Sequence, residues 1–440
     1  MNYSTTVKKQ LESLIEKMNQ YPWLFVRNPT KDFSRVKKWS FGEMMRFTIS
    51  IEGGSLKNEL LKYFGFSMDT PTNSSFNQRR AQILPEAFEF LFHEFKSVVY
   101  KPKLYKGYRL LASDGSDICI SYDPLDKSTY FQSTPDSKGF NQMHLNAFFD
   151  LLTATYTDAI IQPARQENEN SAMCSMIDRC YRGFKTIFIA DRGYENYNIF
   201  AHAQENGMYY LIRAKDISSN GIVHSMKAQL PEGQDSFDEM VNITLTRKQT
   251  NAVKAEPDKY RVVMKTTAFD YLDLYEHKFY EMKMRILRFP ISENSFECII
   301  TNLPRDEFPS ETIKELYNLR WGIETSFREL KYTIGLTHFH SKKRDYIKQE
   351  IWARLILFNF CHAIIAETVP RHVKPNKKHI YQINISRAIC ICRQFLAAKE
   401  KAPPDIESLI SRELLPIRTG RSDPRKVKTQ SAVSFLYRIA

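Results

Sequence analysis

The sequence predicts an α/β fold in which helices flank a mixed β-sheet. Apolar, strand-like runs alternate with helix-like stretches between residues 104 and 215, an order that is typical of this class. The run 184–190 is almost wholly apolar and lies between Gly183 and Gly193, which indicates a strand buried on both faces. The chain has 440 residues, and 42% of them are hydrophobic. That is enough for a large core and for two to four domains.

Residues 1–103 are predicted to form a helical N-terminal region. Apolar residues recur every three or four positions in 5–19 and in 85–99, as they do on the buried face of a helix. A further helix between these two segments is expected to carry Arg79 and Arg80 in its first turns.

Residues 104–215 are predicted to form the first part of the central sheet. The segment 108–122 has the pattern of a strand that runs into an acidic turn and is followed by a return strand. The elements expected after it are a helix near 167–182, the strand 184–190, a helix near 195–206 and a strand over 209–213.

Residues 216–297 differ in pattern and are predicted to form a β-rich insertion. Their apolar and polar residues alternate in 240–246, 260–265 and 281–288, the period of half-buried strands. Residues 298–345 then complete the core, with a strand first and a helix that begins at Glu311. Residues 346–440 are predicted to form a helical, basic C-terminal region.

Four side chains in the segment 317–331 recur at helical spacing. Tyr317, Arg320, Glu324 and Lys331 follow one another at intervals of three, four and seven residues, which places them on one face of a helix. A carboxylate between two cations suits a site that holds a metal ion and a phosphate. The simpler alternative is an amphipathic helix in which Arg320 and Glu324 form an ordinary salt bridge. Tyr317 either orients a phosphate or packs against the core.

Two aspartates elsewhere supply matching acids. Asp191 directly follows the buried strand 184–190, so it is expected at the carboxyl end of the sheet, where α/β folds place ligands. A helix N-cap is an equal alternative for it. Asp114 follows an apolar run in the first strand. Asp117 is its rival, and we prefer Asp114 because the apolar residues precede it directly.

Three gathered carboxylates require a cation. Two unit charges about 4 Å apart repel by about 4 kcal/mol at an effective dielectric constant near 20, so a bare cluster takes up protons. Oxygen ligands alone favour Mg²⁺ or Mn²⁺ over zinc. A pair of such ions can activate a hydroxyl and steady a leaving oxygen in phosphoryl transfer. Arg320 and Lys331 suit contacts with the phosphoryl group.

The chain resembles the DDE transposases of bacterial insertion sequences, in the group with a Tyr-(2)-Arg-(3)-Glu-(6)-Lys signature. Tyr317, Arg320, Glu324 and Lys331 match that spacing. The segments 114–116 and 191–194 match the two aspartate motifs of the family, and 139–150 matches the strand region between them. The resemblance covers roughly residues 30 to 400. It implies a ribonuclease-H-like core with Asp114, Asp191 and Glu324 as catalytic residues and metal ligands.

The resemblance also implies partners and further roles. The expected partners are double-stranded DNA, as the terminal inverted repeats of the element and as target DNA, and a second copy of the chain on synapsed ends. The N-terminal region would recognise DNA ends, so that Arg79 and Arg80 either contact DNA or face solvent. The group also has an insertion that stacks a flipped base on a tryptophan. None of the tryptophans of this chain lies in 216–297, which leaves Tyr271, Tyr275, Phe279, Tyr280 and Phe289 as candidates.

Composition agrees with a nucleic-acid partner. The net charge is +13, which favours polyanions, and residues 341–440 hold 20 Lys and Arg against eight acids. No apolar run is long enough for a membrane helix, and seven scattered cysteines suit reduced thiols in a bacterial cytoplasm. The functional prediction is a cut-and-paste transposase. The alternatives are an inactive or domesticated DNA-binding relative and a ribonuclease-H-like nuclease without strand transfer.

Overall fold

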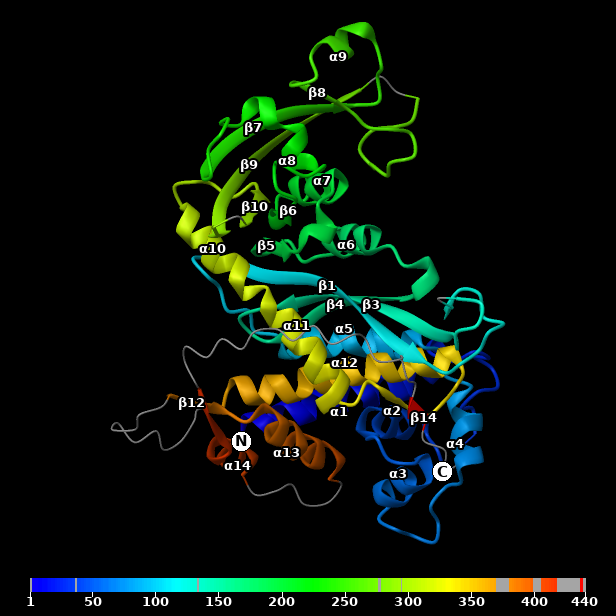
Figure 1. The fold of residues 1–440 in the computed structure, drawn as a ribbon. Helices are drawn as coiled ribbons and strands as arrows, with labels where there is room; N and C mark the ends of the chain where they lie inside the picture. The colour runs from blue at the N-terminus through cyan, green and yellow to red at the C-terminus, as the bar shows by residue number, and fades with distance from the viewer. Residues whose placement is uncertain are drawn as a thin grey trace.

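The computed structural model describes residues 2–35, 38–132, 134–275, 278–293, 295–368, 380–398, 405–417 and 436–437. Figure 1 shows three layers of structure along the long axis of the molecule. A helical body lies at one end, a central sheet with helices on both faces lies in the middle, and the continuation of that sheet lies at the other end. Among the described residues, no helix combines the length and the apolar character that a membrane crossing requires.

Within the described residues, ten strands form one mixed sheet. Its order is β2-β3-β1-β5-β6-β10-β9-β7-β8, and β4 also pairs with β3. The strands are β1 (Tyr108–Ile120), β2 (Tyr130–Phe131), β3 (Phe140–Asp150), β4 (Thr155–Pro163), β5 (Lys185–Ala190), β6 (Tyr209–Ala214), β7 (Phe237–Thr246), β8 (Tyr260–Val262), β9 (Phe279–Ser292) and β10 (Ser295–Thr301).

The centre of the sheet combines antiparallel and parallel strands. Strands β1, β3 and β4 form an antiparallel set, and β5 and β6 are added parallel to β1. Helices α6 (Glu169–Asp178) and α7 (Tyr197–Glu205) pack on one face, where their apolar side chains share a core with Leu111, Phe188 and Ile212. The predicted mixed sheet with flanking helices is thus confirmed.

The first strand corrects one expectation. We predicted a turn near Asp114 and a return strand, but β1 runs without interruption from Tyr108 to Ile120. Strand β3 pairs with it from Leu111 to Ile120, so hydrogen-bonding partners are available on that side along the whole segment. Because the tertiary partner satisfies this backbone, the local preference of Asp and Gly for turns is overridden.

The segment 216–297 continues the sheet instead of forming a separate one. Strand β10 pairs with β6 of the core, β9 pairs with β10, and β7 pairs with β9. Strand β9 therefore belongs to both parts, since its second half pairs with β10 while most of its length pairs with β7. Two short helices, α8 (Ile222–Ser225) and α9 (Asn251–Ala255), accompany these strands.

A helical body covers the other face of the core sheet, where α5 and α12 lie against β4 (Figure 1). Its long helix α12 is buried on all sides for most of its length, including several polar side chains, as expected of a helix that other helices surround. The helices of this body are α1 (Tyr3–Gln20), α2 (Phe41–Ser50), α3 (Leu56–Tyr63), α4 (Asn73–Arg80), α5 (Glu86–Val99), α12 (Arg344–Ala366), α13 (Ile385–Ala397) and α14 (Ile406–Arg412).

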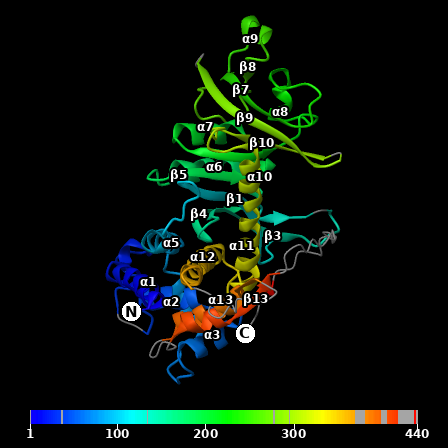
Figure 2. The same ribbon diagram turned by 90° about the vertical axis from the view of Figure 1, so that its left-hand side faces the viewer.

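Two helices connect the sheet to the helical body. Helices α10 (Ser310–Leu319) and α11 (Trp321–Arg328) form a nearly straight rod across the strands in Figure 2. Two pairs of short strands complete the described structure: β11 (His338–Phe339) with β14 (Leu436–Tyr437), and β12 (Ile380–Ile383) with β13 (Leu414–Ile417). Much of the basic region predicted over 346–440 lies outside the described residues.

Arg80 corrects a second expectation, because it faces neither solvent nor DNA. Its side chain is fully buried and forms an ion pair of 2.8 Å with the buried Glu350 of α12. It also donates hydrogen bonds to Gln349 and to the carbonyl of Tyr346. Burial raises the pKa of the Glu350 carboxyl, but the charges of Arg80 and His340 outweigh it and leave the pKa lowered to about 2. Arg80 thus joins α4 to α12.

Arg79 is buried as well, with 8% of its surface exposed. Its guanidinium lies over the ring of Phe33 and donates hydrogen bonds to Gln82 and to the carbonyl of Arg35. Both arginines of α4 are therefore buried inside the helical body, so neither the predicted DNA contact nor the solvent-facing alternative describes them. The spacing of α4 did not reveal this, because the partners of Arg80 lie more than 260 residues away.

We predict that Arg80→Ala lowers the free energy of unfolding by about 3–5 kcal/mol, because it leaves a buried carboxylate without its counter-ion. Chemical denaturation followed by circular dichroism measures this change. Arg27→Ala is the matched control, since Arg27 and Asp345 form an exposed ion pair on the same helical body and such pairs contribute at most about 1 kcal/mol. Equal losses in the two variants would contradict the assignment.

Candidate active site

The register of two parallel strands brings Asp114 and Asp191 together. Ala112 of β1 is the partner of Ile189 of β5, so the residues two positions farther along each chain, Asp114 and Asp191, lie next to each other. Adjacent strands are about 4.8 Å apart. Pairing with β5 ends here, and the two carboxyl groups therefore stand at the carboxyl edge of the parallel strands, where a ligand can reach them.

Asp191 also caps the turn that follows β5. Its Oδ1 accepts a hydrogen bond of 2.7 Å from the backbone N–H of Gly193, at the start of the short helix Arg192–Tyr194. The two alternatives for Asp191, a cap and a site residue, are therefore compatible, because a carboxylate has further lone pairs for another ligand.

Glu324 reaches the same place from α11. Ile323 and Phe327 of this helix lie in the core with Ala112 of β1, and the hydroxyl groups of Ser326 and Tyr156 are 2.8 Å apart in the interior. A Cβ on Gly322 would lie 2.9 Å from the side chain of Leu151, so the absence of a side chain at Gly322 permits this close packing.

The three carboxylates act on one another electrostatically. The pKa of Asp114 is raised to about 7, mainly by burial, and the charges of Asp191 and Glu324 contribute to this rise. The backbone N–H of Gly115, 2.9 Å from Oδ1, and the charge of Arg320 oppose this rise. The structure thus gathers the three predicted acids, and the carboxyl group of Asp114 has an environment that favours either a proton or a cation.

Arg320 supplies positive charge at this site. Its Nη2 lies 2.8 Å from Oε1 of Glu324, while its side chain is only 7% exposed and its Nε has no hydrogen-bond partner. Tyr317 is buried against Ile313 and Leu316, and its hydroxyl also makes no hydrogen bond. The ring of Tyr317 therefore packs against the core, which is one of the two alternatives expected for it.

Lys331 lies farther along, in a π-helical turn over Glu329–Thr333. Burial lowers its pKa, and the charges of Asp117, Cys119 and Asp114 oppose this. The four residues of the 317–331 segment do not share one regular α-helix, because the helix tightens at Arg320 and widens after Arg328. Among the charges that act on Lys331, that of Asp117 has the largest effect.

Two neighbouring side chains differ in exposure. Trp321 is 52% exposed, and the guanidinium of Arg320 lies 4.9 Å from the centroid of its ring. His340 is buried between Glu350 and the carbonyl of Gly54.

The aromatic candidates of the insertion divide into two groups. Tyr275 is 86% exposed and Phe279 is 47% exposed. The other three, Tyr271, Tyr280 and Phe289, pack against the hydrophobic cores. Of the five, only Tyr275 and Phe279 have exposed rings, and a lysine ammonium lies over each of them, Lys265 over Tyr275 and Lys248 over Phe279.

A pocket of about 710 Å³ adjoins Asp191. Its cationic lining residues are Arg192, Lys215 and Arg261, and they come from the turn after β5, the segment after β6 and strand β8. No pattern in the sequence marks these residues, because only the folded sheet brings the insertion beside the turn at Asp191.

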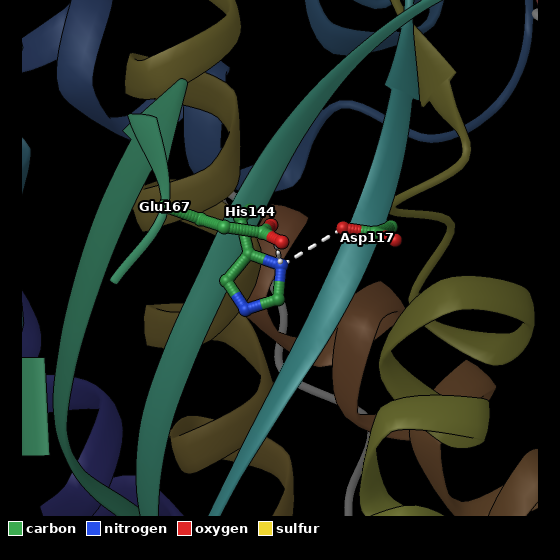
Figure 3. A group of neighbouring side chains, drawn as sticks. All are labelled: Asp117, His144 and Glu167. Carbon is green, nitrogen blue, oxygen red and sulfur yellow. Dashed lines mark hydrogen bonds and ion pairs between the residues drawn. The ribbon is translucent and has the colours of Figure 1, made fainter. Parts of the chain in front are cut away.

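A second polar cluster was also missed. Asp117, His144 and Glu167 have ligand atoms within 4.8 Å of one another (Figure 3). Burial lowers the pKa of His144, but its contacts with Asp117 and Glu169 and the charge of Glu167 outweigh this and raise the pKa to about 9. The signal in the sequence is the pairing of Asp117 with His144 across β1 and β3, which requires the register to be known.

Comparison with known proteins adds a family. The sequence model described as "Transposase DDE domain" matches residues 105–360. The transposase InsG for insertion sequence element IS4 of Escherichia coli (strain K12) is 29% identical over 134 residues, which are 28% of this chain and 29% of the relative. The putative transposase InsL for insertion sequence element IS186A of the same strain is 32% identical over 84 residues, 18% of this chain and 23% of the relative. The matches thus span less than a third of these relatives.

Among solved structures, a chain in the cryo-EM structure of a piggyBac transposase synaptic complex with hairpin DNA is similar in shape. The TM-score is 0.46 at 10% sequence identity, and the match covers 96% of this chain and 87% of that chain.

We predict that Asp114→Asn stabilises the metal-free protein at alkaline pH. Folded Asp114 holds its proton more tightly than the unfolded chain does, so the wild type loses stability as the pH rises from about 4 to about 7. The neutral variant avoids this loss, and it should exceed the wild type by roughly 2–4 kcal/mol above pH 7 and by little near pH 4.

Denaturant titrations in EDTA across this pH range measure the difference between the two proteins. Asp136→Asn, at an exposed position, should change stability little at every pH. A constant difference between wild type and Asp114→Asn from pH 4 to pH 9 would contradict the prediction.

Proposed function

Because the chain belongs to the family of transposase DDE domains, we propose that it is the transposase of a bacterial insertion sequence. In this proposal it cleaves DNA at the ends of the element and transfers the freed 3′-hydroxyl to target DNA. The observation that carries the proposal is the β1–β5 register, which sets Asp114 beside Asp191, together with the electrostatic contact of both Asp191 and Glu324 with Asp114.

Asp114, Asp191 and Glu324 would hold Mg²⁺ or Mn²⁺, and we propose two ions. The fit rests on the chemistry of the site: all the donor atoms are carboxylate oxygens, which these ions prefer, and burial raises the pKa of Asp114, so that bringing it to the ionised form calls for a cation. When bound, the ions would lower the pKa of the attacking hydroxyl and neutralise the negative charge that develops on the leaving oxygen.

The residues of the chain then position the DNA. Arg320 is held by Glu324 through Nη2, and its charge acts on Asp114, so its guanidinium would attract a phosphate oxygen beside the acids. Lys331 has a lowered pKa because it is partly buried, and a weakly hydrated cation of this kind is well suited to a phosphate. Tyr317 would set the direction of Arg320 by packing against it.

The proposed partner is double-stranded DNA, in the form of terminal inverted repeats and of a target. The cationic pocket beside Asp191, with Arg192, Lys215 and Arg261, gives a path for the phosphate backbone away from the acids. The exposed rings of Tyr275 and Phe279 are candidates for stacking a base. We further propose a homodimer on synapsed ends, and action in the cytoplasm at the nucleoid.

The regions of the chain would divide this work. We propose 1–103 as the part that binds element ends, 104–215 and 298–345 as the catalytic core, 216–297 as the insertion that lines the DNA path, and 346–440 as a basic region that adds phosphate contacts.

We predict that Asp114→Asn, Asp191→Asn and Glu324→Gln each reduce cleavage and joining by at least about 100-fold while the affinity for element ends stays within a factor of about three. The substrate is a duplex oligonucleotide that carries the terminal repeats flanking the gene, with Mg²⁺ present. Gel analysis measures nicking and joining, and fluorescence anisotropy measures binding.

Glu315→Gln is the control, because it removes an exposed carboxylate from the helix that precedes Glu324 and should leave both activities unchanged. Joining by Asp191→Asn at the wild-type rate would refute the assignment. Cleavage without joining by the wild type would indicate a nuclease, and tight end binding without either reaction would indicate an inactive relative.

We predict a separate effect for Lys331→Gln. If Lys331 contacts a phosphate, removing its charge weakens DNA binding and lowers the slope of log affinity against log salt by about 0.9. Because the lysine is partly buried, the neutral side chain should not reduce stability.

Salt titrations of binding with both proteins measure the slope. Lys185→Gln is the control, since Lys185 starts β5 at the opposite end of the strand from Asp191 and should leave the slope unchanged. An unaltered slope in Lys331→Gln would exclude the phosphate contact.

A further inference from the structure

Asp117, His144 and Glu167 converge on one ring nitrogen. Nδ1 of His144 lies 2.8 Å from Oδ1 of Asp117 and 3.0 Å from Oε2 of Glu167. Figure 3 shows Asp117 on β1 and His144 on β3 pointing toward each other, with Glu167 arriving from the segment after β4. Three elements of the fold thus contribute to the cluster.

These spacings fit the ligands of a single ion. At metal–ligand distances near 2.1 Å, neighbouring ligands of an octahedral ion are about 3 Å apart. The two carboxylates are also about half exposed, at 50% for Asp117 and 44% for Glu167. An ion therefore has a path from solvent, and water can fill its remaining positions.

The other ring nitrogen has the surroundings of a metal-bound histidine. The side chain of His144 is 6% exposed, and its Nε2 makes no hydrogen bond although Oε1 of Glu169 is 3.0 Å away. A small rotation of either group brings Nε2–H into line with that carboxylate. Metal-ligating histidines commonly present their second nitrogen to a carboxylate, which fixes the tautomer and orients the ring.

The backbone leaves room for this arrangement at Gly115. A Cβ there would lie 2.1 Å from Oε1 of Glu169 and 2.4 Å from Nε2 of His144. The packing of Glu169 on the histidine therefore depends on glycine at this position. The cluster is consequently built into the strand and is more than a chance gathering of surface acids.

The cluster is separate from the acids at Asp114. Side chains alternate between the faces of a strand, and the direction of the Gly115 Cβ shows that its face looks toward His144. Asp117 lies two residues on and shares that face. Asp114 points to the other face, with Ala112 and helix α11. One ion cannot be shared between the two sets of ligands.

We propose that Asp117, His144 and Glu167 form a second metal site, which binds one divalent first-row transition-metal ion such as Zn²⁺, with Glu169 orienting the histidine. An imidazole ligand favours these ions over Mg²⁺, which prefers oxygen. The ion would join β1, β3 and the segment that leads into α6, three residues from Asp114. This proposal does not depend on the proposed function.

The competing arrangement has a proton in place of the ion. In that arrangement His144 is an imidazolium paired with three carboxylates, and the cluster binds no metal. The two arrangements differ in whether the full-length protein takes up a transition metal at this position, so direct metal binding separates them.

The experiment measures Co²⁺ and Zn²⁺ binding to the full-length chain in an excess of Mg²⁺. Calorimetry gives the stoichiometry and affinity, and the visible absorption of Co²⁺ reports nitrogen ligation. A background with Asp114→Asn, Asp191→Asn and Glu324→Gln removes the candidate active site as a competing ligand set. We expect one ion per chain in this background, and a melting temperature that Zn²⁺ raises and EDTA restores.

Two variants test the ligands. Glu167→Gln changes a half-exposed side chain and should weaken binding at least about 10-fold without disturbing the fold. His144→Asn should abolish the Co²⁺ absorption and the thermal shift. If His144→Asn proves unstable, the Glu167→Gln result decides alone.

His202→Asn is the matched control. His202 is also buried, at 8% exposure, and lies between two carboxylates, Asp178 at Nδ1 and Asp270 at Nε2. These carboxylates face opposite ring nitrogens, so they cannot share an ion with one nitrogen, and the control should bind metal like its parent. Absence of a bound ion in the triple background, or unchanged binding in both ligand variants, would overturn the proposal in favour of the ion-paired histidine.

Discussion

The pairing of β1 with β5 is the constraint on which the rest of the structure depends. Parallel register sets Ala112 opposite Ile189, and from this alone Asp114 and Asp191 become neighbours. A slip of one residue would turn Asp114 to the opposite face of the sheet, toward His144 and away from Glu324. The apolar side chains of Leu110, Ile187 and Ile189, buried in one core, oppose such a slip, because they would lose their burial with it. The packing of these side chains therefore fixes the positions of Asp114 and Asp191 at the edge of the sheet.

The candidate active site is balanced electrostatically and not optimised for stability. Burial and two neighbouring carboxylates raise the pKa of Asp114, and one nearby cation, Arg320, opposes them. Folding gathers charges there that repel in the absence of a ligand, so part of the stability of the sheet offsets their repulsion. Sites that must bind a cation commonly keep such electrostatic repulsion, because binding the cation removes the repulsion and this adds to the binding free energy. The buried pair of Arg80 and Glu350 is the opposite case, because it is neutral overall and its hydrogen bonds are satisfied.

The sequence predicted correctly the features that are determined by neighbouring residues in the chain. The apolar run before Asp191 and the helical spacing of Arg320 and Glu324 gave the buried strand, the helix and the acids that the fold brings together. Features that depend on a distant partner were predicted wrongly. Asp114 and Gly115 favour a turn in isolation, but β3 supplies hydrogen bonds along the whole of β1. Arg80 has the spacing of a surface residue, but it is buried because its ion-pair partner Glu350 lies 270 residues farther along the chain. The cluster at His144 requires the β1–β3 register, which no single segment contains.

The position of Glu324 finally depends on a buried polar connection through Tyr156 of β4. The backbone of Tyr156 exchanges two hydrogen bonds with the side-chain amide of Asn359 in α12, at 3.0 and 2.9 Å, and its hydroxyl lies 2.8 Å from that of Ser326 in α11. One residue thus fixes the sheet, the long helix and the helix of the catalytic candidate relative to one another. Apolar packing alone would tolerate a rotation of α11, whereas unpaired buried hydroxyl and amide groups would each cost about 1–3 kcal/mol. Because a site for phosphoryl transfer works mainly by positioning, this directional connection, together with the buried packing of Ile323 and Phe327, holds the third carboxylate in register with the two on the sheet.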